Sequence, residues 1–419
     1  MVARALAVAA CAAGALGLAA CGGGSGGAKT TGADDTARTV HLYSSLPLQG
    51  PEREHAAAIV KGIRLALDEV GGQAGRTLIR YTALDDSSPA ARGWDADVTA
   101  RNARRVAADR AAIGYIGDFD SGASEVSAPI LNRAGIVQVS PASTYVGLTR
   151  RAPGTRPGEP RAYFPTGTRT FLRIVPSDSV EAAALVVTMR RDRCRRAAVA
   201  YDAGQHPESL VALVVHQAAQ RKLALTAPRR VTAAQAGSRR RLATALRAAR
   251  ADCLLYVGAD ADGAVKLYEA VDAVLPKARM YGDSTLCSSS VTSPKQGGLP
   301  VRIGRRYKCT SPTLPLDGYA GGAAFDSEYR AQFANEAADA YALRGYEAAQ
   351  LFVETVARLG GEGADRGAVR SALFATRARI SVLGSYSFDS VGDTTTTECG
   401  VYGAGANGSP RLLTVVDPG

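Results

Sequence analysis

Two short apolar runs, each followed by a polar turn, constrain the fold of this chain more than any other feature. The apolar runs are residues 112–116 and 135–139, and the polar turns after them are residues 117–124 and 140–144. Apolar runs of this length that alternate with a helix-like segment indicate parallel β-strands joined by a crossover helix. In such a sheet both turns lie at the carboxyl ends of neighbouring strands, where open α/β folds bind small ligands.

The segment between the two runs is expected to form a helix that begins at about Gly122. The first N–H groups of a helix have no partner within it, so this helix would direct free donors towards the space beside Ser121. A short ligand carboxylate suits that position. The apolar stripe expected on this helix comprises Val126, Pro129, Ile130 and Ala134.

Alternation of strand-like and helix-like segments continues through the chain in two sets. Apolar strands are expected near residues 40–46 and 77–84 in the first set, and near 197–201 and 254–257 in the second. The length of 419 residues is sufficient for two domains. The predicted fold class is therefore α/β, with two Rossmann-like lobes, each a parallel sheet flanked by helices, joined by a multi-strand hinge. The first lobe is expected to comprise residues 39–172 with 312–383, and the second lobe residues 173–311 with 384–419.

The composition is that of a globular protein with a basic surface. Hydrophobic residues make up 46% of the chain and charged residues 21%, and the formal net charge is +11. A basic balance of this size is one signature of nucleic-acid binding. Here the basic residues are dispersed, aromatic residues are only 6% of the chain, and no recognition module is present. We therefore expect an Arg-rich solvated surface and no nucleic-acid partner.

The first 21 residues have the features of an export signal. Arg4 precedes an apolar stretch, residues 5–17, that is too short to span a bilayer. The stretch ends in Leu-Ala-Ala-Cys at residues 18–21, which resembles a bacterial lipobox and implies lipidation of Cys21. Residues 22–38, rich in Gly, Ser, Thr and Asp, are expected to be a flexible tether. The protein is thus expected to be extracytoplasmic and anchored as a lipoprotein to the outer face of the cell membrane.

Five cysteines lie beyond the export signal, and an exported location permits disulfides. Cys194 and Cys253 each precede an apolar strand, so they would lie at the same edge of a parallel sheet. Cys287 and Cys309 flank a loop rich in Ser, Pro and Gly and could close its base. These two disulfides are expected, although spacing alone leaves other pairings open. No metal site is expected, because none of the four histidines has ligand spacing to another.

Several short motifs, in their order and spacing, carry a resemblance to one family. They are residues 46–51, 62–70, 85–86, 116–124, 129–130, 134–136, 140–144, 148–149, 171–173 and 176–178. The pattern is similar to that of the type I periplasmic binding proteins, in particular the leucine/isoleucine/valine-binding family of ABC importers, and the resemblance covers nearly all of the chain after the export signal. It implies the two-lobed fold of that family, with a ligand held in the cleft between the lobes.

The resemblance assigns ligand-binding roles to the two polar turns of the first lobe. Ser121 would bind the ligand carboxylate through its side chain and backbone, next to Gly122. Ala142 would accept a hydrogen bond from the ligand ammonium group through its carbonyl. Thr144, which follows Ser143, would bind the ammonium or the carboxylate through its hydroxyl and N–H groups.

In the second lobe the sequence departs from the family at the positions that the resemblance implies. His206 falls near a position where the family often has a tyrosine that closes over the ligand, and Asp260 falls near another aromatic contact. Asp283 and Ser284 fall where the family has a glutamate that binds the ammonium group. A shift of one residue in register would let Asp283 replace that glutamate.

The function implied by the resemblance is that of a substrate-binding protein of an ABC importer. We expect a lipid-anchored monomer that binds a small amino-acid-like solute, such as a branched-chain amino acid, and delivers it to an ABC permease. An alternative is a surface ligand sensor with the same fold that signals to a partner protein. Residues 282–285 also resemble the nucleophile block of some esterases, but no motif supplies the histidine base that such a serine needs. Neither enzymatic activity nor a cofactor is therefore expected.

Overall fold

The computed structural model of the chain describes residues 38–419, which belong to one compact unit. The predicted signal segment 1–21, the lipidation site Cys21 and residues 22–37 of the predicted tether lie outside the described residues. Arg38, the last residue of the predicted tether, is the first residue of strand β1. No helix within residues 38–419 combines the length and the apolar character needed to cross a membrane.

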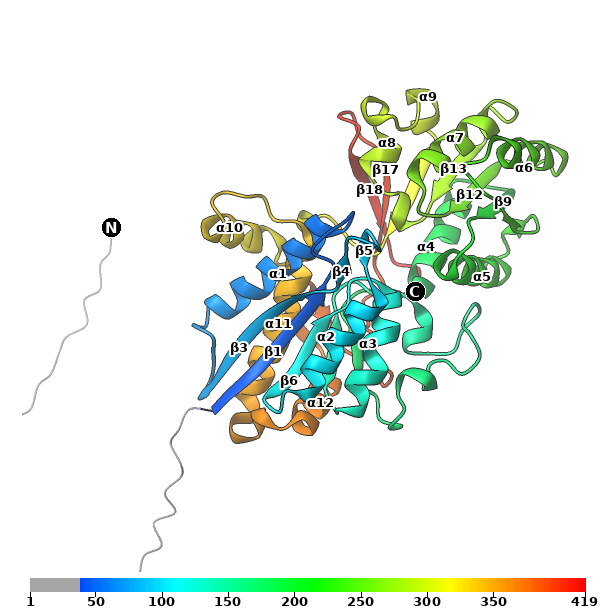
Figure 1. Cartoon of the computed structure of the whole chain (residues 1–419). Helices are drawn as coiled ribbons and strands as arrows, with labels where there is room; N and C mark the ends of the chain where they lie inside the picture. Colours follow the sequence, from blue (N-terminus) through cyan, green and yellow to red (C-terminus); the bar gives the residue numbers. More distant parts are fainter. Residues whose placement is uncertain (1–37) are drawn as a thin grey trace, which may run out of the picture. The chain divides into compact units, whose positions relative to one another are not determined.

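The first of the two large sheets has six strands and is parallel except for its edge strand β2, which runs antiparallel to β3. Figure 1 labels three strands of this sheet, β1, β3 and β6. In the predicted α/β fold such a sheet is flanked by helices on both faces, and this is observed. In spatial order its strands are β2 (Gln73–Ala74), β3 (Thr77–Asp85), β1 (Arg38–Leu46), β6 (Ala112–Gly117), β7 (Val137–Ser140) and β8 (Phe171–Arg173). Its helices are α1 (Arg53–Asp68), α2 (Ala96–Ala108), α3 (Ser121–Arg133), α10 (Gly322–Gln332), α11 (Ala340–Leu359) and α12 (Arg366–Phe374).

The second sheet has eight strands. Strand β17 runs antiparallel to both of its neighbours, β14 and β18. Strand β14 in this sheet was not anticipated, because its sequence alternates little and follows an irregular loop. Its strands are β10 (Ala224–Leu225), β9 (Arg196–Tyr201), β12 (Cys253–Val257), β13 (Arg279–Gly282), β14 (Tyr307–Ser311), β17 (Cys399–Ala404) and β18 (Pro410–Val416), with β11 (Arg229–Arg230) paired to β9. Its helices are α4 (Asp178–Arg191), α5 (Gln205–Gln220), α6 (Ala236–Ala248), α7 (Ala261–Asp272), α8 (Ser289–Thr292) and α9 (Val301–Gly304).

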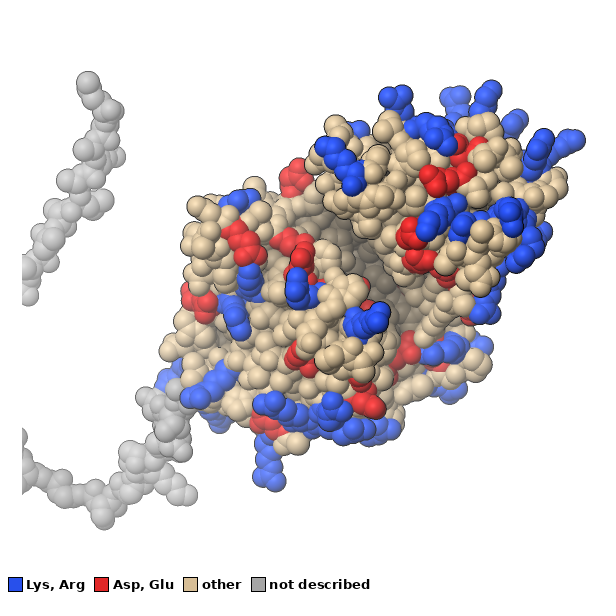
Figure 2. Space-filling model, turned by 45° about the horizontal axis from the view of Figure 1, so that its top comes forward, with Lys and Arg blue, Asp and Glu red and all other residues tan. Residues whose placement is uncertain are grey.

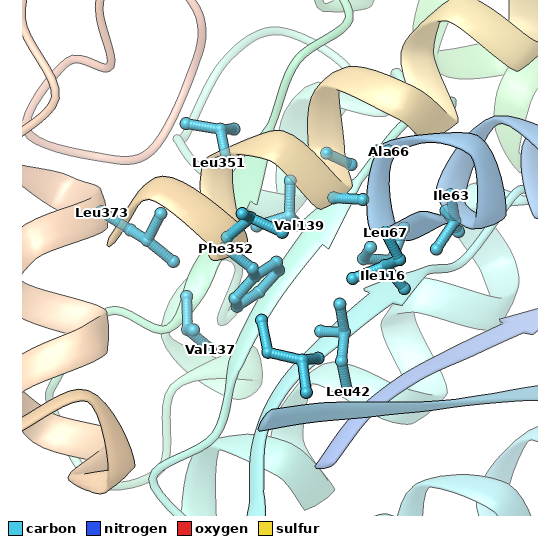
Figure 3. Close-up of a cluster of buried hydrophobic side chains, with 14 of the residues drawn as sticks. Leu42, Ile63, Ala66, Leu67, Ile116, Val137, Val139, Leu351, Phe352 and Leu373 are labelled. Carbon is cyan, nitrogen blue, oxygen red and sulfur yellow. The ribbon is translucent and has the colours of Figure 1, made fainter. Parts of the chain in front are cut away.

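The core of the first half is formed where α1 and α11 cover one face of the sheet. Leu42 of β1 and Ile116 of β6 point from the sheet towards Phe352 of α11 (Figure 3). A Cβ atom at Gly114 would lie only 2.1 Å from the Phe352 ring, so this strand position admits the ring only because it lacks a side chain. The opposite face of the sheet is covered by α2 and α3 through a smaller apolar cluster.

Helices α1 and α11 approach each other closely at two glycines. A Cβ atom at Gly62 would lie 1.9 Å from the carbonyl oxygen of Ala342, and one at Gly345 would lie 2.3 Å from the carbonyl oxygen of Ile59. Any larger residue would force the two helices apart. The contact fixes α11, which comes from the far end of the chain, against the first helix.

The chain passes between the two sheets three times, after β8, after β14 and before β17. A buried ion pair joins the crossing after β8 to the crossing before β17. The Nε of Arg173, which is 0% exposed, donates to the Oδ1 of Asp393 at 2.7 Å. A terminal nitrogen of Arg173 donates to the carbonyls of Ser143 at 3.1 Å and Tyr145 at 2.9 Å. Arg173 therefore ties the polar turn after β7 to the segment that connects the two halves.

Two local features differ from a simple interpretation of the sequence. The stripe Val126, Pro129, Ile130 and Ala134 is half-buried, with Ile130 and Ala134 packed against an apolar cluster, and the fully buried residues of α3 are small or polar except for Leu131. Helix α3 packs on the sheet partly through serines that belong to a polar network. The sequence of residues 380–388 favours a single strand, but the structure has a two-stranded hairpin there, β15 (Arg379–Ser381) and β16 (Gly384–Tyr386), with Val382 and Leu383 in its turn.

Both expected disulfides are present. Cys194 is joined to Cys253, next to the start of β9 and at the start of β12, and Cys287 is joined to Cys309 of β14. These are the pairings that the strand positions suggested, because β9 and β12 are parallel neighbours in the sheet. Cys399 is a free, buried cysteine.

Candidate ligand-binding site

The predicted ligand-binding residues of the first half gather at the carboxyl ends of β6 and β7. Those two strands are parallel neighbours, with Ile116 opposite Val139, so the turns that follow them lie side by side. The space-filling view shows a hollow between the first and the second half of the described residues (Figure 2). The sequence pattern thus placed the polar turns correctly at one edge of the sheet.

The amino end of α3 presents unused hydrogen-bond donors. Among the described residues, no acceptor lies within hydrogen-bond distance of the N–H groups of Ser121, Gly122 and Ala123. The Ser121 hydroxyl accepts a hydrogen bond from the N–H of Tyr145 at 3.1 Å, so its own proton is free to donate. Ser121 and Gly122 are half-buried. A helix amino terminus of this kind is suited to bind a small anion.

The turn after β7 places its three predicted residues in different roles. The Ala142 carbonyl accepts no hydrogen bond from any described residue, and Ala142 is half-buried. The Ser143 hydroxyl is fully buried and bonds to Ser124 Oγ at 2.8 Å and to the Asp118 carbonyl at 3.1 Å, so it supports the turn from behind. Thr144 accepts the N–H of Asp178 through its carbonyl at 2.9 Å, which links the turn to α4.

A buried polar network holds these two turns in place. Asp118 accepts hydrogen bonds from Tyr115 Oη at 2.6 Å, from Ser127 Oγ at 2.5 Å and from Gln138 Nε2 at 3.1 Å. Burial raises the pKa of Asp118 to about 6, against the lowering effect of these donors. Since every one of these side chains is at most 1% exposed, the network fixes the backbone of both turns rather than contacting a ligand.

Two further carboxyl groups at this sheet edge have fewer partners. Asp86 follows β3 and is 0% exposed; its Oδ2 accepts a long hydrogen bond from Ser45 Oγ at 3.5 Å, and its Oδ1 has no hydrogen-bond partner. Asp120 precedes α3, and its buried Oδ2 likewise has no partner. Burial, followed by the negative charges of Asp118, Asp120 and Asp85, raises the pKa of Asp86 to about 9. Burial, followed by Glu52 and Asp118, raises the pKa of Asp120 to about 7.

The single tryptophan of the chain lies against the amino end of α3. A Cβ atom at Gly122 would be 2.6 Å from Cζ2 of Trp94, so the indole covers the backbone there. Trp94 belongs to the hairpin formed by β4 (Ser87–Ser88) and β5 (Gly93–Trp94). The sequence analysis missed this residue; its uniqueness in the chain was the available signal. Its position makes it a natural fluorescent reporter of this site.

In the second half, His206 is held between two carboxylates. Its Nε2 lies 3.3 Å from Asp283 Oδ2, and its Nδ1 lies 3.7 Å from Asp178 Oδ2. Burial would lower the pKa of His206, but Asp178 and Asp283 raise it well above its ordinary value. Both carboxylates are 0% exposed, and Asp283 Oδ1 also accepts from Thr285 Oγ1 at 2.9 Å. Asp283 is thus occupied by protein donors.

Ser284 and Asp260 have local partners in this structure. The N–H of Ser284 donates to Glu181 Oε1 at 2.7 Å, and its hydroxyl donates to Oε2 at 3.1 Å. Burial and the charges of Asp283 and Asp178 raise the pKa of Glu181 to about 8. Asp260 is exposed and caps α7 by accepting from the N–H of Gly263 at 3.0 Å. Glu181 was missed because only the fold brings α4 beside the loop after β13.

The two halves touch directly at the amino end of α5. Gln205 Nε2 donates to Glu125 Oε1 of α3 at 2.5 Å. Arg156, in the long loop after β7, pairs with the same Glu125 and donates through Nε to Glu159 Oε1 at 2.8 Å. These hydrogen bonds and ion pairs, called the polar latch below, join α3, the loop and α5. Among residues 38–419, no group of three or more His, Cys, Asp or Glu side chains is arranged to hold a metal ion.

Comparison with known proteins places the fold and the family. A family profile described as "Periplasmic binding protein" matches residues 44–408. The leucine-binding protein LivK of Thermotoga maritima is similar in structure, with a TM-score of 0.68, 16% identity, and coverage of 90% of this chain and 99% of that chain. The branched-chain amino acid transporter substrate-binding protein LivJ of Streptococcus pneumoniae, solved with isoleucine, has a TM-score of 0.65 and 16% identity over 90% and 99%.

A third similar structure contains a different type of ligand. It is a solute-binding protein of an ABC transporter from R. palustris, solved with benzoate, with a TM-score of 0.67, 17% identity, and coverage of 90% and 96%. No curated protein sequence matches the chain significantly. The predicted two-lobed α/β fold of type I is confirmed by these structures and by the two sheets. Because the profile spans most of the chain, this protein belongs to the periplasmic binding protein family.

Proposed function

We propose that this protein is the extracytoplasmic, lipid-anchored substrate-binding protein of an ABC importer, and that it captures a small amino-acid-like solute between its halves. The observation that carries the proposal is the amino end of α3, where three N–H groups and the Ser121 hydroxyl proton are free to donate. These donors lie at the sheet edge where ligands of open α/β folds bind. Family membership supports the role in solute capture.

The proposed ligand contacts of the first half follow from which groups are free. Ser121, Gly122 and the N–H of Ala123 bind the solute carboxylate, and the Ala142 carbonyl accepts from a donor on the solute. Thr144 lies beside them, while Ser143 positions the turn. In the second half, protonated His206 contacts the bound solute. Asp283 contributes indirectly by pairing with the His206 ring, and Asp260 contributes indirectly by capping α7.

Two similar structures support the choice of solute class. LivJ of S. pneumoniae was solved with isoleucine, and the R. palustris protein with benzoate. Both ligands are small carboxylates, which matches the anion-binding character of the α3 terminus. A branched-chain amino acid or a related compound is therefore the proposed solute, and an ABC permease is the proposed partner.

Titration calorimetry of the mature protein against amino acids, small amides and aromatic acids tests this proposal. We expect saturable binding of at least one amino acid, and a loss of roughly tenfold or more in affinity in Ser121→Ala, because a hydrogen bond to a charged group is removed. Ser409→Ala, at an exposed turn, is the matched control and should bind as the unaltered protein does. Absence of binding by every solute, or equal binding by Ser121→Ala, would contradict the proposal.

A further inference from the structure

The first half of the site contains unpaired acids as well as unpaired donors. Free N–H groups at the start of α3 require an acceptor, whereas the Asp120 carboxylate, one residue earlier, makes no hydrogen bond to any described residue. Asp86, on which the charge of Asp120 acts, is 0% exposed; its Oδ2 accepts one long hydrogen bond from Ser45 Oγ at 3.5 Å, and its Oδ1 has no partner. A buried carboxyl group without a donor is costly unless a ligand supplies one.

The largest charge effects on these two acids are repulsive. They come from Glu52 and Asp118 for Asp120, and from Asp118, Asp120 and Asp85 for Asp86. A positive charge brought by a ligand would relieve this repulsion, and the described residues show no arrangement for a metal ion.

In the second half, the two acids at the expected position of the family's glutamate, Asp283 and Glu181, are already occupied by protein donors. Asp283 is fully buried and occupied by His206 and Thr285, and Ser284 stands at the position of the glutamate that the resemblance implied. Glu181 is 1% exposed and accepts from both groups of Ser284. The imidazolium of His206 also places a positive charge on that side, which disfavours a second cation there.

We propose that Asp120, next to the carboxyl group of Asp86, is the acceptor for the ammonium group of the ligand. The first half alone would then bind both ends of an α-amino acid. This inference rests on the proposed function and specifies its substrate class as zwitterionic. The carboxylate lies on the N–H groups of Ser121 and Gly122 while the adjacent ammonium reaches Asp120, the residue directly before them. A carboxylate without an ammonium group leaves Asp120 unpaired.

The test measures ligand preference in the mature protein, by calorimetry and by the fluorescence of Trp94. The probes are leucine, isoleucine and valine, their deaminated carboxylate analogues, and benzoate. We expect the unaltered protein to bind an amino acid at least roughly tenfold more tightly than its deaminated analogue, as a charge-assisted hydrogen bond implies. In Asp120→Asn this preference should be lost, whereas Asp97→Asn, an exposed acid on α2, should retain it.

A pH profile gives an independent measurement. Because an acid with a pKa raised to about 7 must ionise to bind an ammonium group, amino-acid affinity should rise between about pH 6 and pH 8 and stay flat in Asp120→Asn. Binding of benzoate or the deaminated acids as tightly as amino acids, with Asp120→Asn unchanged, would overturn this inference and leave solute capture intact. Absence of binding by all the probes would overturn both.

Discussion

The Nε2 atom of His206 lies 3.3 Å from the Oδ2 atom of Asp283, which is fully buried. Asp178 also pairs with this ring, with Oδ2 at 3.7 Å from Nδ1. A position where related proteins were expected to have an aromatic contact is thus held by a cation between two buried carboxylates. The two ion pairs make stability depend on the protonation of His206.

Replacing His206 should reduce stability in a pH-dependent way. The pKa of His206 is raised in the folded protein, so its contribution is fully present below the unfolded pKa near 6.5 and is lost as the pH rises through the higher folded pKa. His206→Gln should lower the free energy of unfolding by ~1 kcal/mol at about pH 6. The loss is modest because about a third of the side chain faces water, which screens the ion pairs. The difference should shrink at higher pH. Urea unfolding at several pH values measures it, and a constant difference would contradict the ion-pair explanation.

Replacing Asp86 should increase stability at neutral and alkaline pH. Its pKa is raised to about 9, so the folded protein retains a proton that the unfolded chain releases above about pH 4. Stability is therefore lost as the pH rises from there towards the folded pKa. Asp86→Asn keeps the shape and removes this dependence, and it should raise the free energy of unfolding by ~2 kcal/mol at about pH 8 and by little at about pH 4. A destabilised variant at pH 8 would show that the hydrogen bond from Ser45 outweighs the cost of burying the Asp86 carboxylate.

Loss of the two disulfides should have unequal effects. Cys194–Cys253 closes a loop with a sequence separation of 59, and Cys287–Cys309 one of 22. The longer loop restrains the unfolded chain more, so the double variant Cys194→Ala/Cys253→Ala should lose ~2–5 kcal/mol, and Cys287→Ala/Cys309→Ala somewhat less. Denaturant unfolding gives both values. The opposite order would mean that native packing around Cys309, rather than loop closure, dominates.

Glu125→Gln should weaken closure of the two halves. Glu125 accepts from Gln205 at 2.5 Å across the groove and pairs with Arg156. Loss of its charge should lower ligand affinity roughly twofold to tenfold with little effect on stability, because only a latch between α3 and α5 is altered. Titration of the ligand, followed by Trp94 fluorescence, measures the change. Glu208→Gln, an exposed residue on α5, serves as control, and equal affinities for both variants would exclude the latch.

The sequence predicted the local elements and the sheet edge at which the two polar turns meet. Alternating apolar runs and polar turns located most strands and helices to within two or three residues, and they brought Ser121 and Thr144 together. The pattern did not reveal β14, which is defined by its pairing with β13 and with the distant strand β17.

The charges of the site were harder to predict than its position. The resemblance gave Asp283 a ligand-binding role after a shift of one residue in register. Whether its side chain faces a ligand or His206 depends on where α5 lies against α4. Glu181 lies on α4, far in sequence from the loop after β13, and Asp86 lies in the motif at residues 85–86. The raised pKa of each arises only when the fold buries it beside other acids. The roles of Ser121, Ala142, Thr144, His206 and Asp260 in ligand binding, and the two lobe boundaries, remain predictions.

Native mass spectrometry of the purified mature protein tests the central claim most directly. If the halves close on a small solute at the amino end of α3, the protein should carry a co-purified compound with the mass of an amino acid or a close relative. That compound should be released on denaturation, and its level should fall sharply in Ser121→Ala but not in Ser409→Ala. A protein that carries no small molecule, even after incubation with mixed amino acids, or one that retains it equally in Ser121→Ala, would contradict the account.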